Sequence, residues 1–135
     1  MSGLTVYLAR LIGLFTVLLV AALLIRGSAV VEAAMADGPL MLTYAMISLA
    51  LGLAMILGHN VWSGGALPVV VTLVGWLILA KGLLLLFLTP EPLTRLFERM
   101  QYQYGEHVYL YLAPALVIGL YLTWAGFTRP TSPRR

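Results

Sequence analysis

The sequence predicts an all-α integral membrane protein: a bundle of four transmembrane helices with two short helices at the membrane surface. The 135-residue chain is 61% hydrophobic and only 10% charged, a composition that a soluble domain of this size could hardly bury in one core. Four apolar stretches are each close to the ~20 residues that a helix needs to cross a bilayer. They cover residues 4–25, 40–58, 66–88 and 108–127, and we expect them to form one transmembrane domain over residues 1–135.

Charge and cysteine content exclude several classes of protein. Eight Lys and Arg against five Asp and Glu give a net charge of +3, and the basic residues lie mostly at segment ends, where they can contact anionic lipid head groups. Membrane lipids are therefore expected partners, and the sequence has no basic patch for nucleic acid. The absence of cysteine excludes disulfides, thiolate metal sites, iron–sulfur clusters and cysteine nucleophiles.

The first two apolar stretches are joined by a segment that predicts a short surface helix. We expect the first stretch to be retained as a helix rather than cleaved as a signal peptide, because eleven residues, 26–36, would separate Ile25 from a cleavage after the small-residue run 34–36. Ser28 is a candidate N-cap for an interfacial helix at about residues 29–36, which Asp37-Gly38-Pro39 would end.

The third and fourth stretches are joined by a second predicted surface helix, at about residues 91–101. Its apolar side chains recur at three- and four-residue spacing, as in an amphipathic interfacial helix: Leu93, Leu96, Phe97 and Met100. Four tyrosines then lead into the last span, where an aromatic belt is one interpretation and a quinone or lipid site the other: Tyr102, Tyr104, Tyr109 and Tyr111.

Glycine positions suggest a tandem repeat of a two-helix unit. Sliding residues 8–25 onto residues 70–87 aligns Gly13 with Gly75, and sliding the second span onto the fourth aligns Gly52 with Gly119. Two such units would share one membrane orientation. Leucine-rich helices also align by chance, and that alternative stays open.

Small residues at helical spacing predict how the spans pack. Helix association in lipid depends on close backbone contact, for which small side chains are needed. The expected packing residues are Gly13, Ala50, Ala54, Gly58, Gly75, Gly82, Ala115 and Gly119. We expect them to face the bundle interior, and the alternative is a face between copies of the chain.

Lys81 is the one charge well inside a span. It is either an anchor that snorkels to the head groups or an interior cation that faces a cavity, an anionic substrate or a partner's carboxylate. In the second case Tyr44 or Ser48 is its expected polar neighbour, because no Asp or Glu lies within a span. Arg10, beside Tyr7, is interpreted as a surface anchor of the first span.

The turn between the second and third spans has the most distinctive local sequence, with His59, Asn60 and Trp62 before Gly64-Gly65. Trp62 suits the membrane interface, and His59 with Asn60 can satisfy carbonyls at a helix end. With Val71-Thr72-Leu73-Val74-Gly75-Trp76 and Lys81-Gly82, this turn resembles a set of small bacterial four-helix membrane proteins of unknown function. The resemblance covers about 25 residues and implies no catalytic role.

The sequence predicts no catalytic set, cofactor or metal site. His59 and His107 are the two histidines, and the predicted spans place them on opposite faces, about 30 Å apart. The serines have no acid–base partners at recognisable spacing.

We therefore expect a non-enzymatic accessory or scaffolding subunit, in a homo-oligomer or a larger complex of the bacterial inner membrane. The alternatives are a small-solute or ion transporter with a pathway past Lys81, Thr72 and Tyr44, and a lipid enzyme with a site near Glu106 and His107. Four spans put both termini on one side. Four basic residues flank the spans on each side, so the preference for cytoplasmic termini depends on the basic C-terminal tail.

Overall fold

The computed structural model describes residues 2–27, 30, 33, 36–87, 95 and 108–128, with side chains from residue 112 onward in the last range. Its elements are four α-helices: α1 (Gly3–Arg26), α3 (Gly38–Gly58), α4 (Ala66–Phe87) and α6 (Val108–Thr128). No strand occurs among these residues. The predicted all-α class is confirmed.

Three helices, α1, α3 and α4, are long and apolar enough to cross a membrane. The apolar part of α6 over which side chains are described, Leu112–Thr128, is shorter, although the helix itself extends over 21 residues. The predicted surface helices at residues 29–36 and 91–101 lie outside the described residues, apart from Val30, Ala33, Ala36 and Arg95, which are helical.

Local capping explains where the helices begin and end. Ser2 caps α1 by accepting a hydrogen bond from the Thr5 backbone N–H (3.2 Å), and Gly27, with φ of 77°, follows its last turn. Asp37 accepts from the Leu40 N–H (3.0 Å) and is the N-cap of α3, with Pro39 in the first turn. Asp37 is not helical and separates Ala36 from α3, so Asp37-Gly38-Pro39, predicted as a stop, also begins the next helix.

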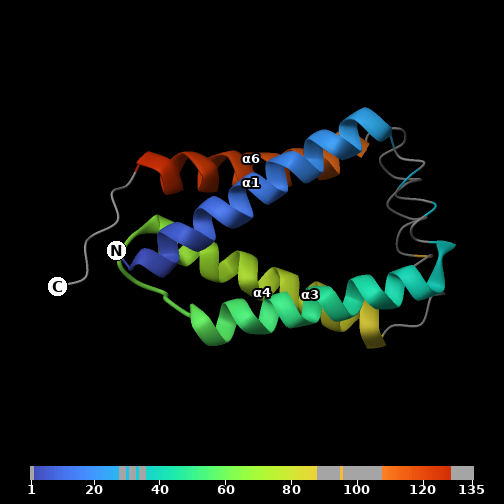
Figure 1. Ribbon diagram of the computed structural model, residues 1–135, viewed down its shortest axis with the longest axis horizontal. Coiled ribbons are helices and arrows are strands. Elements are labelled where there is room, and N and C mark those ends of the chain that lie inside the picture. Colours follow the sequence, from blue (N-terminus) through green and yellow to red (C-terminus); the bar gives the residue numbers. More distant parts are fainter. Residues whose placement is uncertain are drawn as a thin grey trace.

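The helices form two antiparallel pairs, α1 with α6 and α3 with α4 (Figure 1). Contacts within each pair are far more extensive than contacts between the pairs. The turn at residues 59–65 joins α3 directly to α4, whereas α1 and α6 come from opposite ends of the chain. The α1–α6 pairing therefore brings together residues more than 100 positions apart, such as Arg10 and Gly126.

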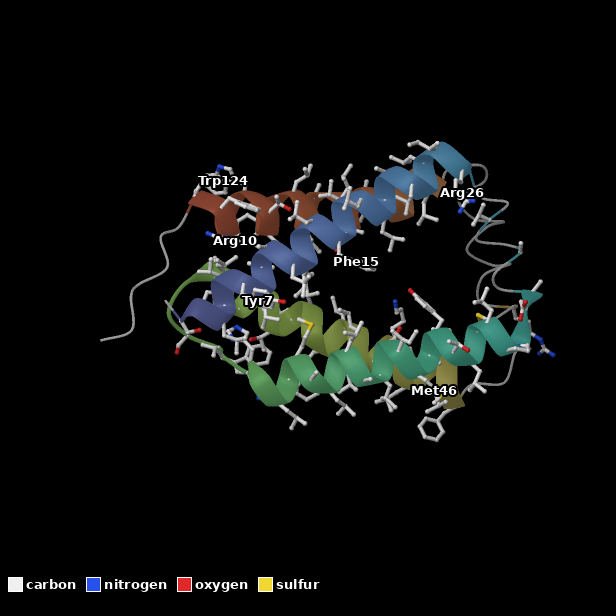
Figure 2. The ribbon with its side chains drawn as sticks, in the orientation of Figure 1. Tyr7, Arg10, Phe15, Arg26, Met46 and Trp124 are labelled. Carbon is white, nitrogen blue, oxygen red and sulfur yellow. The ribbon has the colours of Figure 1, made fainter. Side chains whose placement is uncertain are left out.

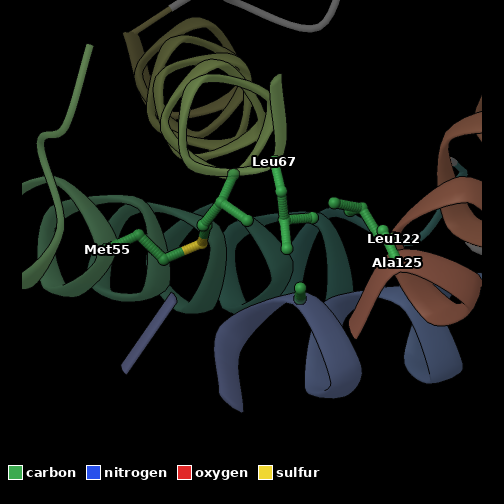
Figure 3. Close-up of a cluster of buried hydrophobic side chains, with 6 residues drawn as sticks. Met55, Leu67, Leu122 and Ala125 are labelled. Atoms are coloured by element: carbon green, nitrogen blue, oxygen red, sulfur yellow. The ribbon is translucent and has the colours of Figure 1, made fainter. Parts of the chain in front are cut away.

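The core that joins the two pairs lies at one end of the bundle. Its buried residues come from the first turns of α1 and α4 and the last turns of α3 and α6 (Figure 3): Ala9, Met55, Leu67, Val71, Leu122 and Ala125. We call this end, which includes the turn at residues 59–65, the packed end. Figure 1 shows the two pairs diverging towards the other end, which carries Arg26 and Gly38 and which we call the separated end.

Glycines allow close backbone contact within each pair. A methyl group added at Gly13 of α1 would lie 2.5 Å from the Thr123 nitrogen of α6, and one added at Gly119 would lie 3.1 Å from the Thr16 Cβ. In the other pair, methyl groups at Gly52 and Gly82 would lie 2.6 Å from the Leu79 backbone and 2.7 Å from the Leu49 nitrogen. Larger side chains there would force the helices apart.

The inner face of α3 differs from the one that the spacing of small residues predicted. Ala50, Ala54 and Gly58 are exposed, and a methyl group at Gly58 would meet no atom within 4 Å. The buried positions of α3 are instead Ala45, Ser48, Gly52 and Met55. Both sets recur at helical spacing, and the set that contains Gly52 is the one that packs on α4, where a methyl group at Gly52 would lie 2.6 Å from the Leu79 backbone.

The two pairs bury equivalent positions. Under the alignment of Gly13 with Gly75, the buried residues of α1 fall on buried residues of α4: Thr5, Val6, Ala9, Gly13 and Val20 align with Leu67, Pro68, Val71, Gly75 and Gly82. Under the alignment of Gly52 with Gly119, Met55 falls on Leu122, which is also buried. The packing of α1 on α6 thus follows the same pattern as that of α4 on α3.

Candidate functional site

The turn at residues 59–65 is fixed to α4 by the Thr72 hydroxyl. Thr72 Oγ1 accepts a hydrogen bond from the Val61 N–H (3.0 Å) and lies within donating distance of the Val61 carbonyl (3.0 Å) and the His59 carbonyl (3.5 Å). Gly64 and Gly65 have φ of 88° and 118°, a backbone region that favours glycine. One buried hydroxyl therefore satisfies several backbone groups where α3 turns into α4.

The three predicted residues of this turn have different environments. The His59 N–H donates to the Met55 carbonyl (2.6 Å) and so extends α3 by one bond. Its side chain is only 3% exposed, and the Nε2 atom has no hydrogen-bond partner among the described residues. Asn60 and Trp62 are exposed, and the Trp62 indole N–H donates to Asn60 Oδ1 (2.7 Å). That bond orients Trp62 at the edge of α3 and α4, where an interfacial aromatic is expected.

Arg10 makes the corresponding contact in the other pair. Its Nε donates to the Gly126 carbonyl (2.8 Å), and its guanidinium carbon lies 4.9 Å from the centroid of the Phe127 ring. Figure 2 shows Arg10 directed towards the C-terminal part of α6. Arg10 was expected to be an anchor at the membrane surface, and in the structure its side chain joins α1 to the end of α6.

These two contacts occupy matching positions. The alignment of Gly13 with Gly75 also pairs Arg10 with Thr72, and that of Gly52 with Gly119 pairs Gly126 with His59. In each pair, a polar side chain from the first half of one helix contacts a carbonyl at the end of its partner. At the packed end, each pair is therefore held by one polar side chain, Arg10 in α1–α6 and Thr72 in α3–α4.

Lys81 lies far from this turn, towards the separated end. Its Nζ donates to the Tyr44 hydroxyl (2.6 Å) and lies 4.5 Å from the centroid of the Tyr44 ring. Both side chains are exposed. At 1.5 Å per residue, Lys81 is about 9 Å from the end of α4 at Phe87 and about 14 Å from Thr72. The structure thus separates Lys81 from His59, Asn60 and Trp62.

Tyr44 was the neighbour expected for an interior Lys81, but the pair is exposed. Among the described residues, no carboxylate lies within ion-pair distance of Lys81. The geometry fits neither of the two alternatives fully: Lys81 is held by a second helix, as an interior cation would be, and it is exposed, as an anchor would be.

The predicted packing residues divide into two groups. Gly13, Gly75, Gly82 and Gly119 lie at contacts within the pairs, and Ala115 is half-buried on α6. Ala50, Ala54 and Gly58 lie on the outer face of α3. Gly52 was not predicted as a packing residue, and its alignment with Gly119 was the signal that could have identified it.

The described residues contain no group of three His, Cys, Asp or Glu side chains that could hold a metal ion. Glu106 and His107, considered for a lipid enzyme, lie outside the described residues, as do the side chains of the tyrosine cluster. No protein-family model matches the chain, and searches of curated proteins and of solved structures likewise find no match.

Proposed function

We propose that this protein is an accessory or scaffolding subunit with four membrane spans, which associates with a second copy or a larger complex through the outer face of α3. The fourth span is supported by the α1–α6 pairing. Because α6 packs along a helix that can cross a membrane and has the same length as α3, it would cross beside α1. The proposed location is the bacterial inner membrane, with cytoplasmic termini, as the basic C-terminal tail favours.

The matching burial patterns of the pairs support a tandem repeat. If residues of α1 and α3 form one unit and those of α4 and α6 a second, each pair joins one helix from each unit. A two-fold axis along the membrane normal then relates α1–α6 to α4–α3. The equivalent contacts of Arg10 and Thr72 fit this relation.

The observation that carries the proposed function is the small-residue face of α3. Ala50, Ala54 and Gly58 follow one another at four-residue intervals and are exposed, so internal packing leaves this face available. In lipid, helices gain little from burying apolar side chains, and association depends on close backbone approach. A face of small residues permits such an approach to a helix of another molecule.

The transporter alternative has less support from the geometry. Its proposed pathway joined Lys81, Thr72 and Tyr44. The Thr72 hydroxyl is used by the turn at residues 59–65, and it lies about 14 Å along α4 from Lys81.

The proposal is tested by the oligomeric state of the purified protein in a mild detergent and in nanodiscs. We expect the wild type to form a stable oligomer, or to co-purify with a defined membrane complex. The double variant Ala50→Leu/Ala54→Leu should dissociate it, because the larger side chains keep a second helix away. These positions are exposed, so the monomer should keep its fold.

A matched control is Ala22→Leu, which enlarges an exposed alanine of α1. It should leave the assembly intact. A wild type that is monomeric and recovers no partner, or a control that dissociates the oligomer as fully as the α3 variant, would contradict the proposal.

A further inference from the structure

Lys81 and Tyr44 lie on the faces of α3 and α4 that are directed towards the other pair. Along α4, Lys81 follows Leu67, Val74 and Ile78 at intervals of seven, four and three residues, so the four side chains share one side of the helix. Leu67 belongs to the core between the pairs, and Val74 and Ile78 pack against it. The side of α4 that carries Lys81 thus faces inward.

Tyr44 has the same relation to α3. Three helical turns separate it from Met55, with Ser48 between them on the same side. Met55 belongs to the core, and Ser48 is buried. Tyr44 is nevertheless 47% exposed, because the two pairs diverge towards the separated end (Figure 1).

The contact between the two side chains is made possible by Gly82. A methyl group at Gly82 would lie 2.7 Å from the Leu49 nitrogen, so α3 and α4 touch beside Lys81. The site is therefore built on two helices whose backbones are in close contact.

Lys81 and Tyr44 retain hydrogen-bond donors that the contact between them does not use. An ammonium group has three N–H donors, and the contact with Tyr44 uses one. The Tyr44 hydroxyl accepts that bond and keeps its own O–H donor. Two N–H groups and one O–H group can therefore converge on oxygens of an anion, and charge-assisted bonds of this kind are the strong ones.

The depth of Lys81 and Tyr44 below the end of α4 indicates the source of the anion. An ammonium about 9 Å below the end of α4 is costly in hydrocarbon unless it is paired or reaches the interface. The long lysine stem covers much of this distance. The exposed side chains next to Lys81 on its side of α4 are apolar, as acyl chains require: Leu77, four residues before it, and Leu84, three residues after it, are exposed.

We propose that Lys81 and Tyr44 form a binding site for the phosphate of an acidic phospholipid, whose acyl chains lie against the inward faces of α3 and α4 at the separated end. The phosphate neutralises Lys81 and accepts from both side chains. An acidic head group is preferred over a zwitterionic one, because choline already balances the phosphate charge of phosphatidylcholine. The site depends on the membrane location of α3 and α4 and not on the proposed scaffolding function.

The experiment is native mass spectrometry of the full chain, released from detergent with phosphatidylglycerol or phosphatidylcholine added over a concentration series. We expect the wild type to bind one phosphatidylglycerol at least about tenfold more tightly than phosphatidylcholine, a difference of about 1.4 kcal/mol, because the choline of phosphatidylcholine already offsets the phosphate charge. Lys81→Met should remove this preference, Lys81→Arg should restore most of it, and Tyr44→Phe should weaken it several-fold.

The matched control is Arg26→Met, which removes one positive charge from an exposed position at the end of α1. It should keep the lipid preference. Circular dichroism and thermal unfolding of each variant establish that the helices are retained, which is expected because Lys81 and Tyr44 are exposed.

Three outcomes would overturn the proposal. One is a Lys81→Met protein that still prefers phosphatidylglycerol, and another is an Arg26→Met protein that loses the preference equally, which indicates general charge attraction. The third is displacement of the lipid by millimolar glycerol phosphate or inorganic phosphate, which would assign the site to a soluble anion. The scaffolding proposal is tested separately, because its readout is oligomeric state.

Discussion

Arg10 of α1 donates a hydrogen bond of 2.8 Å from Nε to the backbone carbonyl of Gly126 in α6. The bond joins two residues from opposite ends of the chain, at the level where the core between the pairs begins. Because the carbonyls in the last turn of a helix have no partner within that helix, Arg10 satisfies a group that would otherwise depend on water or lipid head groups.

Replacing Arg10 with Met should therefore destabilise the α1–α6 pair. A hydrogen bond to a charged group contributes about 1.5–3 kcal/mol, and the half-buried position of Arg10 reduces this to about 1–2 kcal/mol. Reversible unfolding in a mixed detergent system measures the loss. Arg26→Met, which also removes an arginine from α1, should change the free energy of unfolding by less than about 0.5 kcal/mol.

Replacing Gly52 with Ala should destabilise the α3–α4 pair by about 1–3 kcal/mol, the range found for overpacking. The added methyl would lie 2.6 Å from the Leu79 Cα and nitrogen, and backbone atoms cannot move aside as a side chain can. Gly58→Ala is the matched change in the same helix, at a position with nothing within 4 Å. Equal unfolding free energies for the two variants would show that α3 does not pack on α4 through Gly52.

Replacing Thr72 with Val should loosen the turn at residues 59–65. Valine keeps the shape of the side chain but removes the hydroxyl, which leaves the Val61 N–H without its acceptor. The expected cost is about 1–2 kcal/mol, with faster hydrogen exchange at Val61. Thr43→Val provides the comparison, because the exposed Thr43 hydroxyl donates to the Pro39 carbonyl of its own helix. Unchanged exchange at Val61 in the Thr72 variant would contradict this role.

The helices could be predicted from the sequence because the length of each apolar run indicates a membrane-spanning helix. Runs of about 20 apolar residues require a helix in a bilayer, and the observed bounds lie within two residues of the predicted ones. Which face of α3 packs on α4 could not be predicted in the same way. Ala45, Ser48 and Gly52 recur at helical spacing as well as Ala50, Ala54 and Gly58 do, and the choice depends on where Leu79 of α4 approaches.

The roles of the candidate residues could likewise be predicted only in part. His59, Asn60 and Trp62 were recognised as a helix-ending turn, but Thr72 was assigned to a pathway with Lys81, although its hydroxyl holds that turn. The sequence could name Tyr44 as a neighbour of Lys81 because few polar groups lie within the spans. It could not show that the pair is exposed, which follows from the divergence of the two helix pairs.

Four crossings of the membrane can be distinguished from three by the sides on which two segments lie. With four crossings, the turn that contains Ser63 and the C-terminal segment that contains Ser132 lie on the same side; with three, they lie on opposite sides. The chain has no native cysteine, so the single variants Ser63→Cys and Ser132→Cys can be labelled with an impermeant maleimide in sealed vesicles of known orientation. We predict that both cysteines react from the same side, and labelling from opposite sides would contradict the four-span bundle.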